Sequence, residues 1–311
     1  MPLALNGVFL QPMTHGEYAA YERSMGATVV ESDGIYWRRV RPGFYRPLLV
    51  FEPLNHLVVR PPCGASWGGW QYAVCDPEWA NGSISFLVFK SVAGYDLHCL
   101  EKKRRWEVRT AERVFTVRPL NGPEELSAAY PVYVDFQRRT GYKYRSDRLD
   151  PACFAQWARQ VFQHPGVLVL GAWREDCLRA VSVLQRVGRT LIYATFFATG
   201  EALRRHVASL MLHGVRVLGA RLDGVAQIYA GLRKGGGEKS VDEFYLQRGC
   251  EVVTLPARLH VHPVTGWLLR TFRPDLWRRL LGQPVNEGNP PSTQTAAAGA
   301  PVSFSVDSHR D

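Results

Sequence analysis

The sequence predicts an α/β fold of the α+β kind, with helices on both faces of a mixed, mostly antiparallel sheet. The main observation is the order of segments in the second part of the chain. Two segments with helical spacing of apolar residues come first, at 124–139 and 151–163. Three strand-like segments follow at 167–173, 178–187 and 190–197, and their short connections are typical of an antiparallel meander. After the meander, helix and strand alternate, which extends the same sheet.

The first part of the chain, residues 1–112, is expected to be rich in strands. Asp33-Gly34 is a strong hairpin signal between strands at 27–32 and 35–41. Residues 60–70, rich in glycine and tryptophan, are expected to form a loop. The other predicted elements are helices at 16–25 and 95–111, the second strongly basic, and strands at 48–51, 57–60 and 84–90.

The second part, residues 113–282, is predicted to hold the meander and most of the helices. It begins with a strand at 113–120. Ser240-Val-Asp-Glu243 is a capping box that opens a helix at 241–248, and Gly249 ends it. The other predicted elements are a helix at 201–218, a strand at 224–229, a loop at 231–239, a strand at 250–259 and a helix at 267–281.

The helix at 267–281 carries apolar and aromatic side chains with arginines between them. Such a basic amphipathic helix can lie on an anionic membrane surface. Because Pro274 interrupts it, we expect it instead to dock on its own domain. Residues 283–311 are rich in Pro, Ser, Thr, Ala and Gly, so we expect a disordered tail.

The stretch 190–219 is the centre of the predicted fold. A buried strand ends at Phe197, Ala198-Thr199-Gly200-Glu201 interrupts it, and an amphipathic helix follows. A helix start at the carboxyl end of a strand leaves backbone N–H groups unpaired and attracts phosphate or another anion. The alternative is an ordinary packed strand and helix with no ligand.

The charge of the chain points to an anionic partner. The net charge is +10, and because residues 284–311 carry −2, the rest carries +12. Such a surplus favours a phosphorylated cofactor, tRNA or acidic lipid, although a basic surface can also serve solubility alone. No apolar run is long enough to span a bilayer, and no secretory signal is recognisable. With six scattered cysteines and no C-x-x-C, we expect a cytoplasmic protein with reduced thiols.

Motifs for other chemistries are absent from the sequence. The glycine-rich residues 231–240 lack the P-loop spacing, because Glu238 precedes Lys239. His260-Val-His262 is too small a set for a zinc site, and no metal is expected.

Residues 113–263 resemble the GNAT acyltransferase superfamily in the order of their elements. Phe244-Tyr245-Leu-Gln-Arg-Gly249-Cys250 is similar to that superfamily's terminal helix pattern. Ser240-Val-Asp-Glu-Phe-Tyr-Leu-Gln-Arg-Gly249 resembles the S-L-D-x-F-K-x-x-x-G stretch of Fem-type aminoacyl transferases, with Tyr245 in place of the lysine. The resemblance implies that residues 1–112 are a reduced GNAT-like half. The pyrophosphate loop Gln/Arg-x-x-Gly-x-Gly/Ala is missing, and only Ala198-Thr199-Gly200 stands in its place.

The resemblance implies an N-acyltransferase that moves an acyl or aminoacyl group from an activated donor to an amine by direct attack. The implied donor is acyl-CoA, such as acetyl-CoA, with aminoacyl-tRNA as the alternative; the acceptor is an amine on a small molecule or a peptidoglycan precursor. Tyr245 is the candidate acid and Asp223 the candidate base. The candidate donor-binding residues are Phe197, Ala198, Thr199, Gly200, Glu201 and Arg204. The rival hypothesis is a non-catalytic module of the same fold that binds RNA or an acidic membrane. The sequence sets no oligomeric state.

Overall fold

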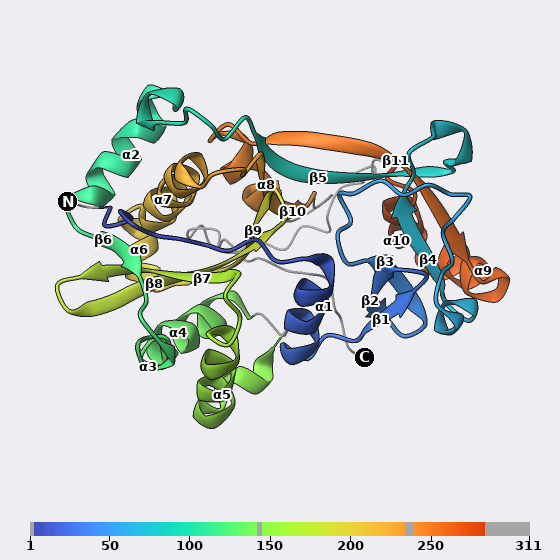
Figure 1. Cartoon of the computed structure of the whole chain (residues 1–311), viewed down its shortest axis with the longest axis horizontal. Coiled ribbons are helices and arrows are strands. Elements are labelled where there is room, and N and C mark those ends of the chain that lie inside the picture. Colours follow the sequence, from blue (N-terminus) through green and yellow to red (C-terminus); the bar gives the residue numbers. More distant parts are fainter. Residues whose placement is uncertain (1–2, 142–144, 234–238, 284–311) are drawn as a thin grey trace, which may run out of the picture.

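The computed structural model describes residues 3–141, 145–233 and 239–283. Its strands form one continuous sheet in the order β1-β2-β3-β4-β11-β5-β10-β9-β8-β7-β6 (Figure 1). Among the described strands only β3–β4 and β9–β10 pair in parallel, so the sheet is mixed and mostly antiparallel, as predicted. Strand β5 lies between β10 and β11, so a strand from the first part of the chain is built into the sheet of the second part.

The amino-terminal elements form one end of the sheet. The predicted hairpin is present as β1 and β2, with Asp33 and Gly34 at φ values of 48° and 76°. These left-handed values suit the Asp-Gly pair. The bounds are α1 His15–Ser24, β1 Val29–Ser32, β2 Ile35–Arg41, β3 Phe44–Pro47, η1 Cys63–Ser66, β4 Gly69–Ala73, η2 Pro77–Trp79 and β5 Gly82–Lys90.

The strand predictions at 48–51 and 57–60 were wrong, and β4, which was not predicted, begins at Gly69 within the last two residues of the predicted loop at 60–70. The reason is a non-local contact. A Cβ on Gly69 would come within 2.2 Å of the backbone oxygen of His260 on β11, so only glycine allows these two strands to pair. The spacing of apolar residues around Gly69 cannot predict this close contact between β4 and β11.

The middle of the chain supplies helices for both faces of the sheet. The predicted helix at 124–139 is two helices, because Pro131 cannot continue an earlier helix and lies in the first turn of α4. The bounds are η3 Leu97–Cys99, α2 Lys102–Glu112, β6 Thr116–Pro119, α3 Pro123–Ser127, α4 Tyr130–Thr140, η4 Ser146–Leu149 and α5 Pro151–Val161.

The predicted meander is present as β7, β8 and β9. The predicted helix at 201–218 is broken, because His206 takes a left-handed φ of 63° between α6 and α7. The bounds are β7 Val167–Arg174, β8 Cys177–Val187, β9 Thr190–Ala198, α6 Gly200–Arg204 and α7 Val207–Arg221.

The last elements return to the amino-terminal end of the sheet along β11. This strand pairs with β5 over Glu251–Ala257 and then with β4 over Ala257–Val261. Pro274 divides the predicted final helix into two helices. Residues 234–238 of the predicted loop, and the predicted tail from 284, lie outside the described residues. The bounds are β10 Gln227–Leu232, α8 Lys239–Leu246, β11 Glu251–Val261, α9 Pro263–Phe272 and α10 Pro274–Leu280.

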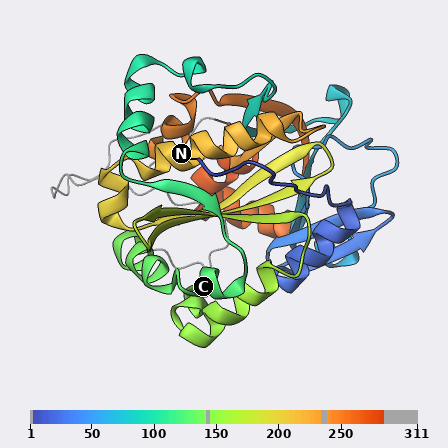
Figure 2. The ribbon, with the colours of Figure 1, turned by 60° about the vertical axis from the view of Figure 1, so that its left-hand side comes forward.

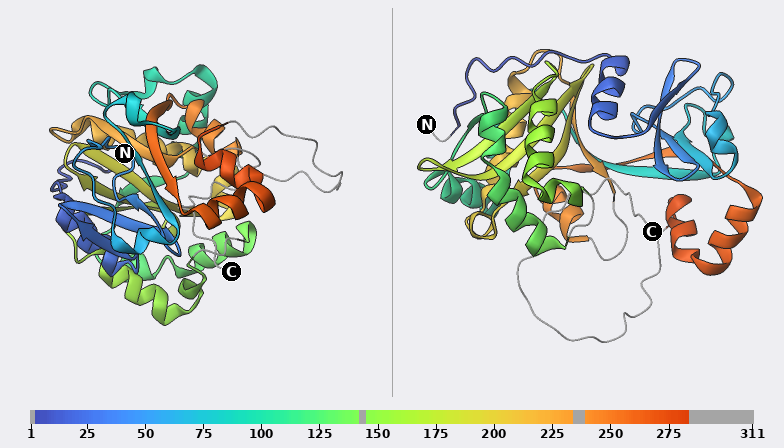
Figure 3. Two further views of the ribbon diagram at one scale, coloured as in Figure 1. Left: turned by 90° about the vertical axis from the view of Figure 1, so that its right-hand side faces the viewer. Right: turned by 90° about the horizontal axis from the view of Figure 1, so that it is seen from below.

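Two apolar layers hold the helices to the sheet. Helices α2, α7 and α8 cover one face, and α1, α4 and α5 cover the other (Figure 2). A smaller cluster around Trp37 and Tyr72 fills the amino-terminal end. Helices α9 and α10 project from that end of the sheet, away from both layers (Figure 3). The layered architecture agrees with the predicted fold class.

One polar group of the first layer is sensitive to pH. His213 on α7 is buried, and its Nδ1 lies 3.0 Å from the hydroxyl of Tyr95. Burial, together with the nearby Arg216 guanidinium, lowers the pKa of His213 to about 4. The unfolded chain therefore takes up a proton on this histidine at a higher pH than the folded chain does.

We expect the free energy of unfolding to fall as the pH is lowered from about 6.5 to about 4, since only the unfolded chain gains the proton in that window. Between pH 7 and pH 5 the loss is about 2 kcal/mol. Urea denaturation at both pH values measures it. His213→Gln should remove this part of the pH dependence, whereas His98→Gln, at an exposed position, should leave it in place. Equal pH dependence in wild type and His213→Gln would contradict the assignment.

Candidate functional site

The sheet opens between β9 and β10. The two strands pair in parallel only at Thr190–Ile192 with Gln227–Tyr229. Beyond Ile192, β9 continues to Ala198 on β8, and no described strand pairs with its other edge. Among residues 193–198, the backbone N–H and C=O groups that point away from β8 therefore have no strand partner in the described chain, and an edge of this kind can bind an extended ligand. We call the space where β9 and β10 part the opening.

Bulges in both strands accompany the opening. The pairing of β8 with β9 shifts register between Val183 and Leu184, and the pairing of β10 with β5 shifts between Tyr229 and Gly231. A bulge bends its strand and increases the local twist. Because both shifts lie beside the last parallel pair, each strand turns away from the other there.

A cavity of about 600 Å³ lies at the carboxyl end of β9. Its lining comes from three places: the start of α6, the last turns of α4, and β8. Four arginines face two carboxylates, so the cavity is net cationic. The lining residues are Asp135, Arg138, Arg139, Arg179, Thr199, Gly200, Glu201 and Arg204.

The backbone donors at the start of α6 are already engaged by the chain itself. The N–H of Gly200 donates to Oδ2 of Asp135 at 2.8 Å, and the N–H of Ala202 donates to Oγ1 of Thr199 at 3.2 Å. The carboxylate of Glu201 pairs with Arg174 at 2.7 Å. The expectation that the N–H groups at the start of this helix are free is therefore corrected for Gly200 and Ala202. An anion in the cavity would mainly contact guanidinium groups.

Arg139 has hydrogen-bond donors that are not used within the described chain. Its Nη2 donates to the carbonyl of Ala198 at 3.3 Å, while its buried Nε and Nη1 have no hydrogen-bond partner among the described residues. The Nε of Arg179 is likewise buried and has no hydrogen-bond partner among the described residues. Burial lowers the pKa of Arg139, and the Asp135 carboxylate opposes that shift. Buried donors without partners are costly, so these two arginines suit a bound anion. No three His, Cys, Asp or Glu side chains in the described chain gather closely enough to hold a metal ion.

The structure brings four of the six predicted donor-binding residues together. Thr199, Gly200, Glu201 and Arg204 line the cavity. Phe197 does not, because its ring packs against Tyr133, Phe154 and Trp157 in the layer under α4 and α5. Ala198 is likewise buried. Alternation along the strand places consecutive side chains on opposite faces, and here both faces are covered.

Asp223 lies at the other end of β9. It precedes β10, and the first residue of β10, Gln227, pairs with the first residue of β9, Thr190. Because the two strands are parallel, Asp223 and Gly200 are separated by the length of β9. The exposed Asp223 accepts a hydrogen bond from Arg186 through its backbone carbonyl. The structure therefore does not bring it to the cavity.

Tyr245 lies where β9 and β10 separate. Its ring makes edge contacts with Tyr193 and Phe89, each at 6.2 Å between centroids. The side chain is only 1% exposed, and burial raises the pKa of its hydroxyl well above the ordinary range. Tyr245 is thus at the closed end of the opening, enclosed by the core, and does not line the arginine cavity.

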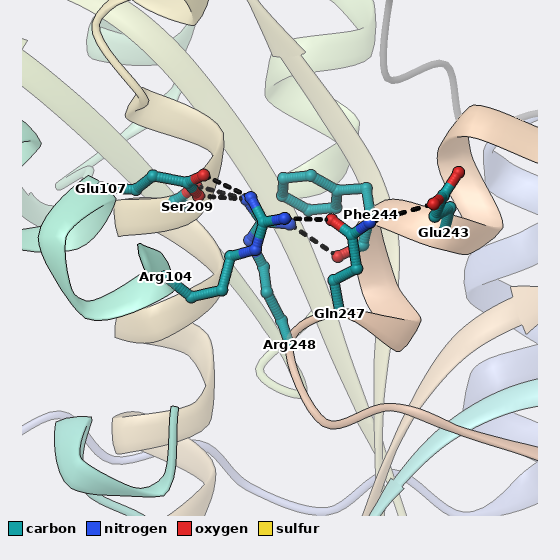
Figure 4. Close-up of polar contacts among 7 residues, drawn as sticks. All are labelled: Arg104, Glu107, Ser209, Glu243, Phe244, Gln247 and Arg248. Atoms are coloured by element: carbon teal, nitrogen blue, oxygen red, sulfur yellow. Dashed lines mark hydrogen bonds and ion pairs between the residues drawn. The ribbon is translucent and has the colours of Figure 1, made fainter. Parts of the chain in front are cut away.

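A buried ion network holds α8, and with it Tyr245, against the neighbouring helices. Arg248 Nη2 lies 2.5 Å from Oε2 of Glu107 on α2, and Ser209 on α7 bridges the two at 2.9 and 3.0 Å (Figure 4). Arg104 pairs with the second oxygen of Glu107 and donates to Gln247. Burial lowers the pKa of Arg248 to about 10, and the Glu107 carboxylate opposes that shift. One carboxylate is therefore shared by two guanidiniums from different segments.

Sequence reasoning missed four residues of the cavity: Asp135, Arg138, Arg139 and Arg179. Arg138-Arg139 is visible as a basic helix end, and Arg179 as a lone charge in a strand. Neither signal points to Gly200, because only the pairing of β8 with β9 and the packing of α4 on β9 bring them there.

The arrangement was compared with known proteins. No protein-family model matches the chain, and no curated protein matches its sequence. Among solved structures, FemX has a TM-score of 0.55 and 10% identity, covering 82% of this chain and 93% of FemX. The fold is that of GNAT-like acyl and aminoacyl transferases. L-PGS from Bacillus licheniformis, with a TM-score of 0.50 and 11% identity, covers 89% of this chain and 100% of its own.

A tandem GNAT protein from the clavulanic acid biosynthesis pathway has a TM-score of 0.41 and 8% identity, covering 80% of this chain and 94% of that protein. The predicted resemblance is confirmed for the fold by FemX and L-PGS. At these identities the likeness concerns the GNAT-like fold alone, and the chemistry has to be argued from the residues of this chain.

We expect Glu107→Gln to lower the free energy of unfolding by about 3–5 kcal/mol, because it leaves two buried guanidiniums without their counter-charge. Chemical denaturation at neutral pH measures the change. Glu243→Gln is the matched control in the same network, since Glu243 is exposed and accepts a hydrogen bond from Gln247. That variant should change stability by less than about 0.5 kcal/mol. Equal effects of the two substitutions would show that the network contributes little.

Proposed function

We propose that this protein is an N-acyltransferase that moves an acyl or aminoacyl group from a phosphate-bearing donor to an amine. The observations that carry the proposal are the parting of β9 from β10 after Ile192 and the cavity with four arginines at the carboxyl end of β9. The opening offers backbone donors to a carbonyl, and the cavity offers cations to phosphates. Both lie along the same strand, as one extended donor would require.

The arginines would hold the phosphates of the donor. Guanidinium groups bind phosphate oxygens through paired, charge-assisted hydrogen bonds. Arg139 and Arg179 have the unused buried donors, and Arg138 and Arg204 add charge at the rim. The Asp135 carboxylate at the N–H of Gly200 occupies the place that a phosphate oxygen would take at a helix start. We propose that the donor displaces it.

The distance along β9 favours a donor with a long arm. Seven residues separate Gly200 from Tyr193, which is about 23 Å at roughly 3.3 Å per residue. In a coenzyme A ester the reactive carbonyl lies at the end of a long flexible arm, far from the phosphates. In aminoacyl-tRNA the ester lies on the terminal ribose, next to a phosphate. We therefore propose a coenzyme A ester as donor, with aminoacyl-tRNA as the other source of the same phosphate chemistry.

The reaction we propose needs no covalent intermediate on the protein. The amine nitrogen attacks the acyl carbonyl carbon, a C–N bond forms, and the C–S bond of the thioester breaks. The N–H groups of β9 would stabilise the developing oxyanion. The nitrogen releases a proton to water, and the leaving thiolate takes one up. We propose Tyr245 as the source of that second proton, because its ring lies beside Tyr193, where β9 and β10 part.

Intact-mass analysis tests the proposal. The purified chain is incubated with a panel of primary amines, including a peptidoglycan precursor, and in separate arms with acetyl-CoA, longer acyl-CoA esters and aminoacyl-tRNA. We expect an amine that gains the mass of the acyl group in a coenzyme A arm. Transfer only from aminoacyl-tRNA would overturn the choice of donor, and no transfer in any arm would overturn the function.

Two kinds of variant separate binding from chemistry. Arg139→Gln and Arg179→Gln should each weaken donor binding about tenfold, because each removes a charge-assisted hydrogen bond. Arg189→Gln, an exposed arginine at the far end of β9, is the matched control and should bind normally. Tyr245→Phe keeps the packed ring and should lower turnover without changing donor affinity. Unchanged turnover in Tyr245→Phe would reduce that residue to a packing role.

One observation favours a rival function, a non-catalytic module that binds an anionic partner such as RNA. The N–H of Gly200 is held by Asp135, and the glycine-rich pyrophosphate loop is missing from the sequence. Binding to RNA that falls steeply with salt, together with the absence of turnover and no effect of Tyr245→Phe, would support this rival.

A further inference from the structure

Helices α9 and α10 form a projecting pair that lies outside both core layers. In α9 only Gly266 is buried, and in α10 no residue is. The pair is attached through backbone groups, since the carbonyls of Leu280 and Leu281 accept from Gln71 and Ser83. The segment thus docks on its own domain, as expected, and its half-buried apolar side chains are Leu269, Leu276, Trp277 and Leu280. A second set of apolar side chains stays exposed.

The outward face of α9 is apolar and aromatic. Val264, Trp267, Leu268 and Phe272 follow the spacing of one helix face, and all are exposed, Trp267 at 59% and Phe272 at 65%. The rings of Trp267 and Phe272 contact each other edge-on at 6.0 Å. We call Val264, Trp267, Leu268, Phe272 and the adjacent Trp67 the aromatic patch.

Trp67 adds a second chain segment to the aromatic patch. It is 79% exposed, and its ring stacks at 6.3 Å on His262, which precedes α9. Its carbonyl accepts from Oγ1 of Thr265 at 3.3 Å. The loop and the helix thus present large apolar side chains together, although each lies far from the other in sequence. A patch of this kind marks an interaction surface.

Helices α9 and α10 carry exposed cationic side chains as well as the aromatic patch. Residues 263–283 contain four arginines and a single carboxylate, Asp275. Arg270, Arg273, Arg278 and Arg279 are exposed, and Arg270 stacks on Trp277 at 4.5 Å. The only ion pair within α9 and α10 that the described residues show joins Arg278 to Asp275 at 3.9 Å. The segment therefore has an excess of positive charge beside its exposed aromatic rings.

We propose that α9 and α10, with Trp67, dock this protein on an anionic lipid surface. Tryptophan and phenylalanine insert at the level of the headgroups, and arginines pair with acidic headgroups around them. A second copy of this chain or another protein could also cover the apolar face. Such a partner would not explain the excess of exposed arginines on α9 and α10. The proposal is independent of the proposed transferase activity.

No helix in the described part of the chain is long and apolar enough to cross a bilayer.

Sedimentation of the full chain with vesicles tests the proposal. We expect it to bind vesicles made of an equal mixture of phosphatidylglycerol and phosphatidylcholine. Its affinity for vesicles of pure phosphatidylcholine should be at least about tenfold weaker. The double variant Trp267→Ser/Phe272→Ser should lose at least about tenfold in affinity for the anionic vesicles. Arg278→Gln/Arg279→Gln should weaken binding and flatten its dependence on salt.

Trp106→Ser is the matched control, because Trp106 on α2 is 57% exposed and lies at the opposite end of the molecule (Figure 1). It should bind vesicles as the wild type does. The substituted positions are exposed, so each variant should unfold at the wild-type temperature. Equal vesicle binding by Trp267→Ser/Phe272→Ser and wild type would overturn the proposal. The proposal would also be overturned if the wild-type chain self-associates and does not bind vesicles, while Trp267→Ser/Phe272→Ser is monomeric.

Discussion

The end of parallel pairing between β9 and β10 is the constraint on which the rest of the structure depends. Strand β8 holds β9 along its whole length, and β5 holds β10 antiparallel on its far side, so neither strand can move to close the gap. The bulges beside Tyr193 and Gly231 turn the two strands apart. Because β5 comes from the first part of the chain, that part contributes directly to the shape of the opening. The buried Tyr245 lies at the closed end of the opening and so limits its depth.

Two clusters of arginines and carboxylates in the molecule differ in their surroundings. Around Glu107, two guanidiniums share one buried carboxylate, which ties α2 and α8 together and supports Tyr245 from behind. Around Gly200, four arginines have only Asp135 and Glu201 beside them, and buried donors of Arg139 and Arg179 are left over. In both places guanidiniums outnumber carboxylates two to one, and the buried Nε atoms of Arg104 and Arg248 lack a partner among the described residues just as those of Arg139 and Arg179 do. The arginines around Gly200 differ in that they line a cavity of about 600 Å³, where an anion can reach them.

Sequence patterns were sufficient where local forces decide the structure. The meander, the Asp33-Gly34 hairpin and the break at Gly200 follow from alternation, turn chemistry and capping. They failed where distant segments meet. The left-handed turn at His206, the pairing of Gly69 with β11 and the insertion of β5 beside β10 have no local signature. For the same reason Thr199, Gly200, Glu201 and Arg204 could be named from the sequence, while Asp135, Arg138, Arg139 and Arg179, brought in by other elements, could not.

Residue-resolved amide hydrogen exchange along β9 tests the account most directly. The account predicts that, among residues 193–198, amides directed away from β8 exchange markedly faster than those bonded to β8, and that coenzyme A slows them. In Arg139→Gln that slowing should require a higher concentration of coenzyme A. If the amides of 193–198 directed away from β8 are instead as protected in the free protein as those of Thr190–Ile192, the strands do not part, and the account is contradicted.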